Sequence, residues 1–293
     1  LIVILLLFFF FLYQTSDFSF SNASSFLNTT TRIFLLMSFL FLANFMVKKN
    51  NLTKDSSYTI LFFLLFLLIF PTAFNDSKSL FSNFFLLLAI RRLISLQTLK
   101  EPKEKIFDAS MWIFIASLFH FWCIIFVLLV YISIIFHVSR DYRNWLIPFV
   151  AFFTTAVIFI FSALLFDKSW ITHIISQTQI NFQLDYFTHI YQNLALSFYV
   201  VIMVYFLVAM MFSLANRPMN LQASYKKMIF GVLIGCAVFL ISPEKNSTMF
   251  LFTFMPLSVI CTTHVEYSQS KLYQEMLLFF LLVGSFVAFF AQL

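Results

Sequence analysis

Long apolar runs recur from the first residue of this chain to the last, and this pattern limits its possible folds more than any other feature. Runs such as TILFFLLFLLIF are separated by short polar breaks, among them PTAFNDSKS and KEPKEK. One buried core cannot use so much apolar surface, whereas the hydrocarbon of a bilayer solvates it. Charged residues make up 10% of the chain, against about 25% in soluble domains. The sequence therefore predicts an all-α polytopic membrane protein.

The runs do not alternate in polarity, which argues against an outer-membrane barrel. They predict membrane helices at residues 1–13, 33–47, 58–73, 79–91, 107–136 (one helix or two), 147–166, 194–214, 228–242, 248–262 and 276–291. The run 1–13 has no basic flank, so we interpret it as a span that begins before Leu1 and not as a signal peptide. At about 1.5 Å per residue, the shorter runs barely cross a 30 Å hydrocarbon core.

The block 107–136 is either one crossing or a hairpin that turns at SLFHFW, residues 117–122. With a hairpin, 14 of the 18 Lys and Arg residues fall on one side of the membrane. With a single helix the later loops change sides, and the split becomes 10 to 8. Basic residues collect on the cytoplasmic side of membrane proteins. The charges therefore favour the hairpin and about 11 crossings.

In this topology the loops 48–57, 92–106, 137–146, 215–227 and 263–275 are cytoplasmic. The two long external loops are 14–32 and 167–193. The predicted location is the bacterial inner (cytoplasmic) membrane, which the protein crosses many times. The apolar residues of loop 167–193 also predict one or two helices lying on the outer leaflet.

The order of parts over residues 1–200 resembles the N-terminal module of the GT-C superfamily of polyprenyl-phosphate-sugar glycosyltransferases. It comprises an acid in the first external loop (YQTSDFSF), a hairpin broken by PTAFNDSKS, the basic loop RRLISLQTLKEPKEK and the helical pair SMWIFIASLFHFWCIIFVLLVYI. Residues 201–293 then add C-terminal transmembrane helices. The segment LLLAIRRLISLQTLKEPKEKIFDASMWIFIASLFHFW is also similar to uncharacterised inner-membrane proteins of Flavobacteriia-type bacteria.

The GT-C resemblance implies an external active site that transfers a sugar from a polyprenyl-phosphate donor to an acceptor. It assigns the catalytic base to Asp17, the one acid of its loop, where the family often has paired acids. A carboxylate held near an acceptor hydroxyl could remove its proton. Cationic residues of the external loops would hold the donor phosphate.

Five further residues are candidates for binding the lipid phosphate or the substrate, and each also has a structural explanation. Asp76 and Lys78 could contact a phosphate, or could belong to a tight polar turn. His120 could bind phosphate, or could lie at the membrane interface. Lys168 and His173 could face a lipid donor, or could belong to an interfacial belt without a ligand.

Other classes of function receive little support. The three cysteines have no metal-binding spacing, no cofactor motif occurs, and neither a metal nor a cofactor is predicted. The acids lie in loops or at helix ends, which disfavours an ion-coupled transporter. The basic loops suit anionic lipids better than nucleic acid. The alternative to an enzyme is a non-catalytic subunit of an envelope complex, and GVLIG (Gly231–Gly235) could pack inside the bundle or against such a partner.

Overall fold

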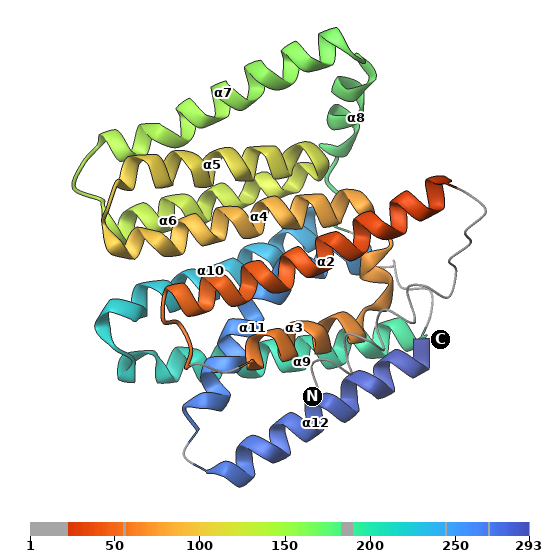
Figure 1. Cartoon of the computed structure of the whole chain (residues 1–293), viewed down its shortest axis with the longest axis vertical. Helices are drawn as coiled ribbons and strands as arrows, with labels where there is room; N and C mark the ends of the chain where they lie inside the picture. Colours follow the sequence, from red (N-terminus) through yellow and green to blue (C-terminus); the bar gives the residue numbers. More distant parts are fainter. Residues whose placement is uncertain (1–22, 55–56, 183–189, 244, 269, 293) are drawn as a thin grey trace.

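The computed structural model describes residues 23–54, 57–182, 190–243, 245–268 and 270–292, and within them it contains helices and no strand (Figure 1). The predicted first span and Asp17 lie outside these ranges. The α-helices are α2 (Ala23–Lys49), α3 (Tyr58–Ile69), α4 (Ser77–Ser95), α5 (Pro102–Phe119), α6 (Val127–His137), α7 (Arg143–Leu165), α8 (Ser169–Gln177), α9 (Ile190–Ser213), α10 (Met219–Ile241), α11 (Leu251–Glu266) and α12 (Lys271–Gln292). Short 3₁₀ turns are η1 (Pro71–Phe74), η2 (Leu96–Thr98), η3 (Phe121–Phe126), η4 (Leu214–Asn216) and η5 (Ser247–Phe250).

The centre of the bundle is formed by α3 and α11, which are buried over nearly their whole length. The helices α7 and α12 lie at opposite edges (Figure 1) and expose many large apolar side chains. Seven helices of the described chain are long and apolar enough to cross a membrane, and Tyr58–Ile69 and Phe121–His137 are shorter apolar helices. An apolar outer surface around an apolar core is expected where lipid is the solvent. The chain folds as an all-α bundle of a multi-pass membrane protein.

The predicted hairpin at residues 117–122 is present. Helix α5 ends at Phe119, the backbone of His120 is extended, and η3 and α6 lead back along α5 (Figure 1). The Nζ atom of Lys103, near the start of α5, lies 3.4 Å from Oδ2 of Asp141, just beyond the end of α6. The hydroxyl of Ser82, on the neighbouring helix α4, is 3.0 Å from both the Ala116 carbonyl in α5 and the Cys123 sulfur in η3. One extended residue and a 3₁₀ turn reverse the chain without Gly or Pro.

Successive long helices run in opposite directions, so the loops gather at two ends of the bundle (Figure 1). We call one end, where the described residues of 48–57, 92–106, 137–146, 215–227 and 263–275 lie, the basic end. It is held together by bonds between the loops that were predicted to be cytoplasmic, such as Lys227 Nζ to the Leu93 carbonyl (2.6 Å). We call the other the pocket end, and there the Arg32 guanidinium donates to the Asn75 carbonyl (2.7 Å). The described loops thus lie at the two ends as the charge-based topology groups them, although residues 23–32, predicted to belong to an external loop, are part of α2.

The GxxxG motif packs inside the bundle, where α10 crosses α11. A Cβ atom added at Gly231 would lie 3.2 Å from Cγ of Pro256, and one at Gly235 would lie 2.6 Å from Cγ2 of Thr253. Glycine therefore lets the two helices approach each other closely. The boundary predicted at residue 200 falls within the continuous helix α9.

Candidate functional site

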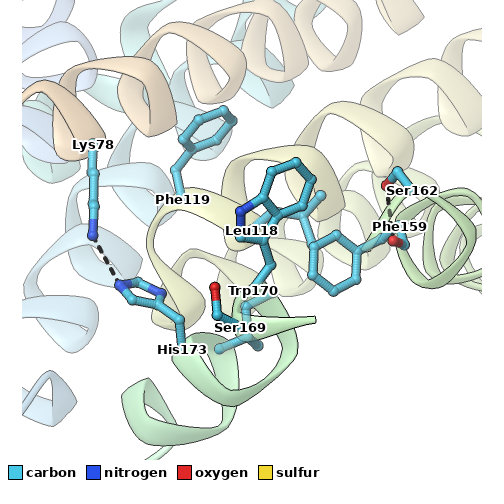
Figure 2. A pocket seen from close by; sticks show the side chains of 9 residues that line it. Lys78, Leu118, Phe119, Phe159, Ser162, Ser169, Trp170 and His173 are labelled. Carbon is cyan, nitrogen blue, oxygen red and sulfur yellow. Dashed lines mark hydrogen bonds between the residues drawn. The ribbon is translucent and has the colours of Figure 1, made fainter. Parts of the chain in front are cut away.

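Two of the predicted site residues meet at the pocket end. Lys78 lies in the first turn of α4 and His173 lies on α8, 95 positions later, yet Lys78 Nζ is 2.8 Å from His173 Nε2 (Figure 2). An ammonium group has donors and no acceptor, so it donates this bond and Nε2 accepts it. Both side chains are exposed. The pair is therefore a cationic group that a ligand can reach.

The pair stands at the edge of a mainly apolar pocket with a volume of about 560 Å³. Its walls come from α4, α5, α7 and α8, and the side chains of Leu118, Phe119, Phe159 and Trp170 line it (Figure 2). Ile174 and the hydroxyl-bearing residues Ser162 and Ser169 complete the lining. Apolar walls with a few polar groups are typical of sites that bind small molecules.

Helix α8 holds His173 and Trp170 in place, and its start is fixed by Asp167. The carboxylate of Asp167 accepts hydrogen bonds from the Ser169 hydroxyl (2.6 Å) and the Ser169 amide (2.8 Å). These bonds lower the pKa of the Asp167 carboxyl below its usual value. At the other end of α8, the side-chain oxygen of Gln177 accepts from the Phe121 amide (3.3 Å), which ties α8 to the α5–α6 hairpin.

The other candidates are placed differently. Asp76 caps α4 by accepting from the amides of Lys78 (3.0 Å) and Ser79 (3.2 Å), and it faces a second, polar pocket. This is the structural role of a tight polar turn, because a helix N-terminus has unpaired N–H groups. His120 is buried, with Nε2 3.4 Å from the Ser242 hydroxyl. Lys168 is exposed at the start of α8 and does not line the apolar pocket. Asp17 lies outside the described residues.

The sequence-based prediction did not identify two groups of buried cationic residues. At the basic end, Lys227 and Arg217 are buried, although the sequence indicated only their side of the membrane. Lys227 donates to the Leu93 carbonyl, and the Arg217 guanidinium lies 3.9 Å from the ring centre of Tyr267. At the pocket end, Lys245 is buried in a segment that was predicted to be a polar break between membrane helices. No periodicity or motif marks these positions, so the sequence carried no signal for them.

Among the described residues, no cluster of three or more His, Cys, Asp or Glu side chains could hold a metal ion. The pocket end offers the Lys78–His173 pair with its single ammonium group, hydroxyl and amide groups, and an apolar cavity. No curated protein and no solved structure matches the chain. A family model matches it over residues 1–293, and the chain belongs to that family, which is described as a family of unknown function, DUF6427.

Proposed function

We propose that this protein binds the phosphate of a long-chain lipid at the pocket end of the bundle. The observation that carries the proposal is the Lys78–His173 pair at the edge of the apolar pocket. A phosphate oxygen could accept hydrogen bonds from the Lys78 ammonium and from the imidazole N–H of His173. The lipid chain would lie along Phe119, Phe159 and Trp170, where apolar contact replaces contact with bulk lipid.

The proposed orientation places the pocket end outside the cell and the basic end in the cytoplasm of a bacterium. The basic end carries most of the Lys and Arg residues, in agreement with the positive-inside rule. In this topology ten crossings come from α2, α3, α4, α5, the η3–α6 segment, α7, α9, α10, α11 and α12. The run 1–13 would supply the eleventh. Helix α8 would lie on the outer leaflet and cover the bound lipid.

The activity that we propose for this site is transfer of a sugar from a polyprenyl-phosphate donor to an external acceptor, as the GT-C resemblance implies. Lys78 would neutralise the phosphate and His173 would donate a hydrogen bond to it while its bond to the sugar breaks, and Asp17 would take the proton of the acceptor hydroxyl. The alternative, a non-catalytic subunit, would need a surface for its partner. The GxxxG motif does not provide one, because Gly231 and Gly235 pack against α11 inside the bundle.

Binding is tested with the full-length protein in nanodiscs, titrated with a polyprenyl phosphate and with the matching polyprenol. A charge-assisted hydrogen bond contributes about 1.5–3 kcal/mol, so we expect Lys78→Met to weaken phosphate binding by at least about tenfold and to leave polyprenol binding unchanged. Lys168→Met is the matched control, because it removes the same charge from the same end of the protein but outside the pocket. Equal affinities of wild type and Lys78→Met for the phosphate would reject the proposal.

Catalysis is tested separately with Asp17→Asn. If Asp17 is the base, this variant should bind the polyprenyl phosphate as the wild type does and should lose transfer from a polyprenyl-phosphate hexose. Wild-type transfer by Asp17→Asn would remove Asp17 from the mechanism. Binding of the lipid without any transfer by the wild type would instead favour the non-catalytic alternative.

A further inference from the structure

A groove runs between α5 and α7 at the basic end, the end opposite the apolar pocket. Both helices begin at the basic end and pack side by side (Figure 1). The groove has a volume of about 510 Å³, within the size range of small-molecule sites. It is lined by Lys103, Glu104, Phe107, Asp108, Ile147 and Val150. We call it the α5–α7 groove.

The character of the groove changes along its length. On α5, the charged residues Lys103 and Glu104 lie in the first turn, and Phe107 follows one turn deeper. On α7, Ile147 and Val150 are three residues apart and therefore share a face of the helix. The groove thus has two charged groups where the helices begin and an apolar wall further into the bundle.

The start of α7 carries the residue types that mark a membrane surface. Tyr142 and Trp145 lie there and are exposed, and these two residue types are enriched where lipid headgroups meet water. Leu146 and Phe149, which follow on α7, are 55% and 57% exposed, as expected of a surface in contact with lipid. A lipid can therefore enter the groove from the side, with its headgroup near the helix starts and its chains deeper.

The charged groups of the groove differ in how they are already bonded. The carboxylate of Asp108 lies 2.8 Å from the Arg92 guanidinium. The Lys103 ammonium lies 3.4 Å from Asp141 Oδ2, which leaves its other N–H donors for a second acceptor. Glu104 is exposed, and its carboxylate has no ion pair or hydrogen bond with any other residue that the structure describes. The groove therefore presents an ammonium group with spare donors beside a carboxylate that is open to a ligand.

These two groups complement the headgroup of phosphatidylethanolamine, which has a phosphate and a primary ammonium group. The lipid ammonium would donate to the Glu104 carboxylate, and the lipid phosphate would accept from Lys103. Phosphatidylcholine has the same net charge but no N–H donor. Phosphatidylglycerol has no ammonium, so its negative charge would lie beside the Glu104 carboxylate.

We propose that the α5–α7 groove binds phosphatidylethanolamine in the leaflet next to the basic end, with its acyl chains along Phe107, Ile147 and Val150. The proposal uses none of the residues of the pocket end and does not rest on the function proposed above. Failure of the polyprenyl phosphate experiment would leave it unaffected, and the reverse also holds.

The test identifies the lipid that occupies the groove. The photoreactive amino acid p-benzoylphenylalanine replaces Val150, which lines the groove and is 56% exposed. The full-length protein is placed in nanodiscs with equal amounts of dioleoyl phosphatidylethanolamine, phosphatidylcholine and phosphatidylglycerol and is irradiated, and mass spectrometry identifies the attached lipids. The same replacement at Ile158 is the control for position, because Ile158 is 63% exposed on the same helix but lies outside the groove.

Phosphatidylethanolamine should be enriched about threefold to tenfold at position 150 over each of the other lipids, relative to position 158. This range corresponds to one hydrogen bond at a partly exposed site. Glu104→Met should remove the enrichment, and it should fold because Glu104 has no partner among the described residues. Glu275→Met is the matched control, because it removes an exposed carboxylate near the start of α12, at the same end but outside the groove.

Enrichment that is lost in Glu104→Met and kept in Glu275→Met would support the proposal. Equal labelling by the three lipids at position 150 would overturn it. Enrichment of phosphatidylglycerol would also overturn it and would assign the groove to anionic lipids. Enrichment of phosphatidylethanolamine that persists in Glu104→Met would show that the carboxylate does not select the lipid and would likewise reject the proposal.

Discussion

Gly235→Ala is expected to destabilise the bundle, although alanine favours helices more than glycine does. The added Cβ would lie 2.6 Å from Cγ2 of Thr253, closer than two carbon atoms can approach. Thr253 cannot easily turn away, because its hydroxyl donates to the Phe250 carbonyl (2.7 Å) and lies 2.6 Å from the Tyr199 hydroxyl. Either α10 moves away from α11 or these buried hydrogen bonds are lost.

The size of the effect follows from three contributions. Overpacking a core costs about 1–3 kcal/mol, and losing a buried hydrogen bond costs about 1–3 kcal/mol. The higher helix propensity of alanine returns about 1 kcal/mol. The protein can avoid one of the two costs by accepting the other, so a single cost of about 2 kcal/mol, less the roughly 1 kcal/mol returned, leaves an expected net destabilisation of about 1 kcal/mol. Gly231→Ala is the matched control: its Cβ would meet only the Pro256 side chain, at 3.2 Å, and should change stability by less than about 0.5 kcal/mol.

The assay is unfolding by SDS in mixed micelles, followed by circular dichroism for each variant in the same detergent. Thr253→Ser removes the clashing methyl group and keeps the hydroxyl, so Gly235→Ala combined with Thr253→Ser should be more stable than Gly235→Ala alone. A double-mutant cycle isolates this coupling. The reasoning would be refuted if Gly235→Ala were as stable as the wild type, or if Thr253→Ser gave no relief.

Two further predictions concern the pocket end and the topology. The pKa of Asp167 is lowered by its bonds to Ser169, so its contribution to the stability of α8 is fully present above the usual aspartate pKa of 3.8 and is lost as the pH falls through the lowered value. The fluorescence of Trp170, in a variant whose other tryptophans are Phe, should therefore change in acid, and Asp167→Asn should abolish this pH dependence. For the hairpin, cysteines placed at Lys100 and Ser139 in a cysteine-free background should both react with an impermeant maleimide in inside-out vesicles and not in spheroplasts. Labelling from opposite sides would contradict the hairpin.

The arrangement of helices was largely predictable because each membrane helix corresponds to an apolar run in the sequence. The run 276–291 corresponds to α12, and the break at residues 117–122 corresponds to the turn at His120. The α5–α6 hairpin could not be predicted from hydropathy alone, because its turn is itself apolar. It required the distribution of Lys and Arg, which depends on all the later loops together.

The site was less predictable, because apolar runs do not specify which loops meet. His173 reaches Lys78 across 95 positions because α8 packs against α7 and Gln177 joins α8 to Phe121 of η3, an arrangement that no local pattern encodes. The segment SPEKNS, residues 242–247, has the composition of a solvated break. Lys245 lies within this segment and Thr248 directly follows it, yet both are buried. Polar residues buried at helix ends have the same composition as exposed loops, so the sequence cannot tell the two apart.

The shortness of α3 has a consequence for the surrounding bilayer. Its 12 residues extend over about 18 Å, well short of a hydrocarbon core of about 30 Å. The surrounding lipids do not contact this short helix, because α3 is enclosed by the helices packed around it and ten of its residues are buried. The lipid-facing helices α7, α9 and α12 have 23, 24 and 22 residues, enough to span the hydrocarbon. The bilayer around the protein should keep its normal thickness, and thicker or thinner membranes should tilt these outer helices while leaving α3 undisturbed.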